Sequence, residues 1–115
     1  MSNLDNIDLS QMAQMFKALS HPKRLEIFLD FASCIPPGTV EKTTEEQMAV
    51  CQREISAVHE LAPSTVSHHI KELRISGLIH QERRGKEIFI SVNPDALETL
   101  HFFTRNLGCK TNWKE

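Results

Sequence analysis

Five polar residues that follow Pro63 have side chains suited to binding a nucleic acid. A helix over this stretch would place Val66, Ile70 and Leu73 on one face, within about 40° of one another. The polar residues point away from that face or lie at its edge: Ser64, Thr65, Ser67, His68 and Lys71. Hydroxyl and ammonium groups contact phosphates, and Lys and His reach base acceptors in the DNA major groove. The face therefore suits DNA, although a solvated helix face is an equally weighted interpretation.

His69 differs from its neighbours because its position on the helix falls beside Val66. We expect it to be a packed or hydrogen-bonded structural residue and exclude it from the DNA-contact set.

A second basic group follows, at a point where the apolar period changes from helical to alternating. The segment after Gly77 predicts a β-hairpin whose tip carries Arg83, Arg84 and Lys86 around Gly85. Three cations in four residues, next to a polar helix, favour phosphate or minor-groove contact over a role in solubility alone.

Composition limits the remaining possibilities. The chain has 115 residues, enough for one domain, and with 40% apolar and 24% charged residues it has an ordinary globular composition. Few glycines, few aromatics and no tyrosine favour helices over an all-β fold. No long apolar run or signal peptide is apparent, so we expect a cytoplasmic protein with no membrane partner. The three cysteines, odd in number and not closely paired, suggest reduced thiols.

The net charge of −2 conceals an asymmetry along the chain. Residues 1–62 hold 5 Lys and Arg against 9 Asp and Glu, whereas residues 63–115 hold 8 against 6. The predicted DNA-contacting groups lie in the positive half.

The predicted elements form a single domain over residues 1–115, mainly α-helical with a small β-hairpin. Apolar spacing predicts helices from Leu9 to Leu19 and from Pro22 to about Ala32, a loop over 33–43, and an uncertain helical stretch from Thr43 or Thr44 to Val50. A helix-turn-helix is expected at about 53–76, a hairpin wing at about 78–92, and a last helix at about 94–107, ended by Gly108.

Four segments together resemble the ArsR/SmtB family of winged helix-turn-helix repressors. They are residues 18–27 (ALSHPKRLEI), 61–73 (LAPSTVSHHIKEL), 76–79 (SGLI) and 83–86 (RRGK), and the similarity extends from about Leu9 to Phe103. The resemblance implies a homodimer formed through the first and last helices. It also implies double-stranded operator DNA as partner, and a metal, metalloid or other signal that releases the DNA.

The sensing sites of that family are only partly matched. Its Cys-x-Cys motif meets Cys51-Gln52-Arg53, and its last-helix zinc pattern meets Asp95-Ala96-Leu97 with no histidine in register. Some relatives carry cysteines in positions like those of Cys34 and Cys51, which makes this pair the best candidate for the inducer site. Arsenite would need three sulfurs, with Cys109 as the third, and soft or borderline metals are also compatible. Buried structural cysteines, or oxidation sensing without metal, are weighed equally with ligand binding.

Two other functional classes have partial support in the sequence. An enzyme is disfavoured, because Ser20 and Lys23 form a Ser-x-x-Lys pair without its companion motifs and with Pro22 between them. A winged-helix protein-interaction module without DNA binding, or a redox sensor without metal, remains the alternative to a DNA-binding regulator.

Overall fold

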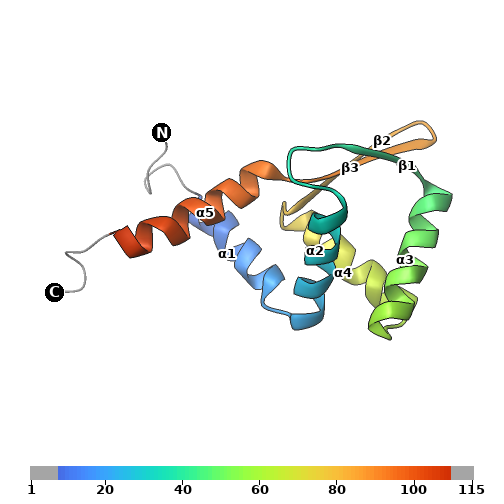
Figure 1. Ribbon diagram of the computed structural model, residues 1–115, viewed down its shortest axis with the longest axis horizontal. Helices are drawn as coiled ribbons and strands as arrows, with labels where there is room; N and C mark the ends of the chain where they lie inside the picture. The colour runs from blue at the N-terminus through green and yellow to red at the C-terminus, as the bar shows by residue number, and fades with distance from the viewer. Residues whose placement is uncertain (1–7, 110–115) are drawn as a thin grey trace.

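The fold contains five helices and a three-stranded sheet within residues 8–109, the part of the chain that the computed structural model describes; the side chain of Cys109 lies outside that description. In chain order the elements are α1 (Leu9–Leu19), α2 (Pro22–Cys34), β1 (Glu41–Thr44), α3 (Glu45–His59), α4 (Pro63–Ile75), β2 (Ile79–Arg84), β3 (Glu87–Val92) and α5 (Pro94–Cys109). Figure 1 shows α1 and α5 together at one end of the molecule, with α3 and the β2–β3 hairpin at the other. The expected winged helix-turn-helix fold is confirmed.

Local sequence signals explain most helix ends. The Asp8 carboxylate accepts hydrogen bonds from the backbone N–H groups of Ser10 and Gln11, so Asp8 is the cap of α1. Both α2 and α4 begin with proline, which needs no hydrogen-bond partner for its nitrogen in the first helical turn. After α4, Gly77 adopts a left-handed conformation with φ 87°, as the sequence predicts for a residue just beyond a helix.

The predicted loop over 33–43 is wrong at both ends. The helix α2 continues to Cys34, and Glu41–Thr44 forms a strand that pairs antiparallel with β3, Glu41 opposite Ile90. The sheet therefore has the order β1-β3-β2 and is more than a hairpin. This strand is short and mostly exposed, and its partner is distant in sequence, so no local periodicity revealed it.

Two helices are longer than the sequence predicts. The first helix of the helix-turn-helix begins at Glu45, well before the expected start near residue 53. The Thr44 hydroxyl accepts a hydrogen bond from the Gln47 N–H, and the acids Glu45 and Glu46 lie in the first turn, which stabilises a helix start without an apolar stripe. At the other end of the chain, α5 continues through Gly108 to Cys109.

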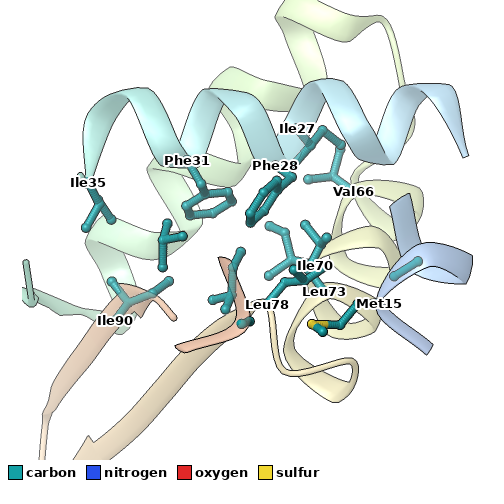
Figure 2. Close-up of a cluster of buried hydrophobic side chains, with 14 of the residues drawn as sticks. Met15, Ile27, Phe28, Phe31, Ile35, Val66, Ile70, Leu73, Leu78 and Ile90 are labelled. Atoms are coloured by element: carbon teal, nitrogen blue, oxygen red, sulfur yellow. The ribbon is translucent and has the colours of Figure 1, made fainter. Parts of the chain in front are cut away.

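The core joins α2, α4 and the sheet. Figure 2 shows Phe28 and Phe31 of α2 packed towards Ile70 of α4 and Leu78 at the start of the wing. Val66 and Leu73 are fully buried, and burial of such a side chain stabilises the fold by about 1.5–3 kcal/mol. This packing fixes the inner face of α4 and so determines which residues face outward.

Between residues 8 and 109, no helix combines the length and the hydrophobicity needed to cross a membrane.

Candidate DNA-binding surface and cysteine site

The helix α4 presents its polar residues to solvent. Ser64, Ser67, His68 and Lys71 are exposed and Thr65 is half-buried, on the side of α4 opposite the buried Val66 and Ile70. The side chains singled out from the sequence thus form one accessible face of a helix that is anchored by its other face. Such a helix can enter a major groove without disturbing the core.

A three-residue turn joins α3 to α4 and holds their relative angle. Glu60 adopts the left-handed conformation with φ 54°, and the Leu61 N–H donates to the Ser56 carbonyl over 3.0 Å. The Ser56 hydroxyl donates in turn to the Leu61 carbonyl. A further bond runs between the helices, from the Ser67 hydroxyl to Gln52 Oε1 over 3.1 Å. These contacts make α3 and α4 one unit.

His69 is a buried residue of α4, only 3% exposed, and is confirmed as packed and hydrogen-bonded. Its Nδ1 accepts a hydrogen bond from Arg24 Nε of α2 over 3.2 Å. Burial lowers the pKa of His69, and the charges of Arg24, His21 and His68 lower it further. A neutral imidazole is also what the Arg24 bond requires, because a protonated Nδ1 cannot accept.

The wing cations are exposed, but two of them already have acidic partners. Arg83 Nη2 lies 3.0 Å from Glu45 Oε2 in the first turn of α3, and Arg84 Nε lies 3.2 Å from Glu82 Oε2. The Arg84 guanidinium also lies 4.8 Å from the centre of the Phe89 ring. Lys86 is exposed beside Gly85 in the turn between the two strands. DNA phosphates would have to compete with these intramolecular carboxylates.

A hollow of about 400 Å³ lies between α3, α4 and the wing, and it brings together residues from both predicted groups. Lys71 of α4 and Arg83 of the wing line it. Its lining also includes polar residues that were missed from the sequence, among them Gln52 and Arg74. Arg74 follows Lys71 by one helical turn, so helical spacing could have found it, whereas only the folded α3–α4 pair reveals Gln52.

The candidate inducer residues Cys34 and Cys51 line a different cavity, about 380 Å³ in volume, between α2 and α3. Cys34 is exposed and Cys51 is half-buried. Burial raises the pKa of the Cys51 thiol, and Glu54 and Cys34 raise it further. Within residues 8–109, no group of three His, Cys, Asp or Glu side chains has the geometry of a metal site. Cys109, the third predicted sulfur, has its side chain outside the described part.

The chain is similar in sequence to known bacterial regulatory proteins. The model of the family described as bacterial regulatory protein, arsR family, matches residues 45–81, which contain α3, α4 and the start of the wing. The HTH-type transcriptional regulator YgaV of Escherichia coli is 29% identical over 86% of this chain and 87% of its own. The transcriptional repressor SmtB homolog of a Synechocystis strain is 26% identical over 79% of this chain and 58% of its own.

The fold is shared with solved structures of low sequence identity. A homodimeric winged helix-turn-helix DNA-binding domain from Mycobacterium bovis, a possible ArsR-family regulator, has a TM-score of 0.54 and 18% identity. The match covers 99% of this chain and 92% of that one.

Proposed function

We propose that the chain is a DNA-binding transcriptional regulator of the ArsR family, which its similarity to that family supports, and that it acts as a homodimeric repressor released from operator DNA by a signal at Cys34 and Cys51. The family is one of regulators, not enzymes. The observation that carries the proposal is the outward polar face of α4 beside a cationic wing.

In the proposed complex, α4 lies in the major groove and the wing contacts the adjacent backbone. Ser64, Thr65, Ser67, His68 and Lys71 are the α4 contacts, and Arg83, Arg84 and Lys86 are the wing contacts. Lys and His reach base edges, while the hydroxyl and guanidinium groups hold phosphates. The net charge of −2 does not oppose this, because residues 63–115, which contain α4 and the wing, hold 8 Lys and Arg against 6 Asp and Glu.

The proposed dimer uses α1 and α5. Apolar side chains on these helices remain exposed in the single chain: Leu9 69%, Phe16 42% and Leu107 42%. Phe16 of α1 packs edge-to-face on Phe103 of α5, with ring centres 5.4 Å apart, which joins the two helices into one apolar surface. The Mycobacterium bovis domain of the same fold is homodimeric, which supports a dimer here as well. Two copies would place two α4 helices on an inverted repeat with half-sites about one helical turn of DNA apart.

The proposed signal acts where α2 meets α3, because α3 is the first helix of the DNA-binding pair. Two thiols at this boundary suit a soft ion such as arsenite, a soft or borderline metal, or an oxidant. A complete arsenite site needs a third sulfur, for which Cys109 is proposed. Preferential binding of the signal to a conformation with low DNA affinity, by about 3 kcal/mol, would weaken operator binding roughly 150-fold.

DNA binding is tested with the protein kept reduced by a thiol reductant, as expected for a cytoplasmic protein. The DNA is the segment upstream of its own gene. Fluorescence anisotropy at several salt concentrations should give a steep decrease of affinity with salt, a slope of about −0.9 per neutralised phosphate. Footprinting checks the half-site spacing. Addition of arsenite, zinc, cadmium or an oxidant should release the DNA, and Cys34→Ser and Cys51→Ser should abolish release. Unchanged release in both variants would remove the cysteines from the proposal.

The alternative function is a winged-helix module that binds another protein. The ion pairs Arg83–Glu45 and Arg84–Glu82 favour it, because they neutralise wing cations without DNA. Absence of salt-dependent binding to upstream DNA would support this alternative.

A further inference from the structure

The cavity between α2 and α3, which contains the candidate inducer cysteines Cys34 and Cys51, also has the chemistry of a pocket for an apolar ligand. We propose that it binds a small, uncharged, apolar molecule. The binding itself is independent of the proposed repressor function, whereas its expected effect on DNA rests on that function.

The walls of the cavity are mainly apolar. Phe31 and Ile35 come from α2 and the residue after it, and Ile55 and Val58 come from α3. The two thiols add polarisable surface that behaves as small apolar groups when protonated. The volume of about 380 Å³ lies at the small end of the range of about 300–1,000 Å³ that ligand pockets occupy. A peptide helix is too large for this space, and a single metal ion leaves most of it empty.

Charge at the cavity selects against anions. Two carboxylates, Asp30 and Glu54, lie on its wall, and no Lys or Arg of the described chain lines it. Asp30 is partly satisfied by the protein itself, because its Oδ2 lies 2.8 Å from His59 Nε2. An anionic ligand would meet two negative groups and no positive one. A neutral molecule meets no such repulsion and leaves the contact between Asp30 and His59 intact.

The described part of the cavity is not built as a metal site. The residues described supply no group of three His, Cys, Asp or Glu side chains at suitable geometry. Thiols among aliphatic and aromatic side chains are instead good neighbours for an apolar ring.

A molecule bound in the cavity would contact α3, the first helix of the proposed DNA-binding pair. His59, the last residue of α3, has its two ring nitrogens 3.2 Å from Glu26 Oε1 and 2.8 Å from Asp30 Oδ2. This histidine therefore ties the end of α3 to α2 beside the cavity wall. A molecule that moves α2 and α3 apart would lengthen the contacts of His59 with Glu26 and Asp30. Because His59 precedes the turn into α4, we expect α4 to shift and the affinity for operator DNA to decrease.

The test uses a fluorescent dye pair on the full-length reduced protein. N-phenylnaphthylamine is uncharged and fluoresces in apolar surroundings, and anilinonaphthalene sulfonate is the same ring system with an added negative charge. We expect saturable binding of one uncharged dye per chain, and at least tenfold weaker binding of the anionic dye. Equal or tighter binding of the anionic dye would overturn the proposal.

Variants locate the dye. Cys51→Phe fills the cavity and should weaken binding of the uncharged dye at least tenfold. Val58→Phe is a second filling variant with the same expected effect. Val58 is 75% exposed, so the fold should tolerate the larger ring at this position. Val50→Phe adds the same ring to α3 outside the cavity, at a 45% exposed position, and should leave binding unchanged. Equal binding in all these proteins, or no binding to the unmodified chain, would show that the cavity is not the site.

The DNA experiment separates the two proposals. Dye binding that is lost in the filling variants, with unchanged operator affinity, would support the ligand site and contradict the proposed coupling to DNA. Failure of the chain to bind upstream DNA at all would overturn the proposed repressor function. The ligand pocket would then be judged from the dye experiment alone.

Discussion

Arg24 of α2 donates a hydrogen bond from Nε to Nδ1 of His69, a buried residue of α4, the helix proposed to contact DNA. The same guanidinium donates from Nη1 to the Ala18 carbonyl at the end of α1 over 3.5 Å. One side chain thus connects three helices. The position of α4 depends on this polar contact as well as on the apolar core.

Removal of the Arg24 guanidinium should destabilise the protein. Arg24→Met retains the apolar stem but leaves the buried Nδ1 of His69 without its donor, and an unsatisfied buried acceptor costs about 1–3 kcal/mol. Urea denaturation at fixed protein concentration measures the free energy of unfolding. The control is Lys23→Met, which removes only an exposed pair to Glu26 and should change stability by no more than about 0.5 kcal/mol. Equal small effects in the two variants would contradict the role of Arg24.

Acid should destabilise the fold through His69. Its pKa in the folded protein lies below the ordinary value of 6.5, so at pH values between the two the unfolded state binds more protons. The free energy of unfolding therefore decreases as pH falls from about 6.5 towards the lowered pKa. His69→Gln removes this titration, so the variant should lose less stability than the unmodified protein between about pH 7.5 and pH 5.5. The two proteins differ only at residue 69, so parallel stability curves would assign no pH dependence to His69.

The ion pair between Arg83 and Glu45 should reduce DNA affinity. The Glu45 carboxylate occupies a place on the guanidinium that a phosphate would take. Glu45→Gln should therefore raise operator affinity about two- to fivefold, the effect of an exposed ion pair of about 0.4–1 kcal/mol. Anisotropy titrations at low salt measure it.

Glu46→Gln is the matched control for that experiment. It removes the same charge from the first turn of α3, and Glu46 forms no ion pair with Arg83. Both substitutions lessen the general repulsion of phosphates, so the difference between them isolates the pair. Equal gains in affinity would show that Arg83 is not restrained by Glu45.

The inner face of α4 could be predicted from sequence because its cause is local. Val66, Ile70 and Leu73 recur at helical spacing, all are buried, and the outward direction of Ser67 and Lys71 follows from them. The strand β1 could not be predicted, because the partner that makes Glu41–Thr44 a strand is β3, far along the chain.

The polar contacts at the candidate sites also depend on long-range folding. Arg83 meets an acid 38 residues away, and His59 meets Asp30 at a separation of 29. The family resemblance suggested Cys34 and Cys51 as a pair, but the apolar cavity around them appears only when α2 packs against α3. The outward direction of the polar residues of α4 was therefore accessible from sequence, and the surroundings of the two cysteines were not.

Dimerisation should fail when a charge is placed on the surface formed by α1 and α5. Phe16 packs on Phe103 and remains 42% exposed, so it lies on the proposed interface where α1 meets α5. Phe16→Glu would bury a carboxylate without a partner there, so the dimer dissociation constant should rise at least tenfold, or by more than about 1.4 kcal/mol. Sedimentation equilibrium measures the association. Val40→Glu adds the same charge at a 61% exposed apolar position before β1 and should leave the dimer intact. Operator affinity should follow the dimer, because one chain contacts only one half-site. A Phe16→Glu protein that remains dimeric would place the interface on another surface of the chain.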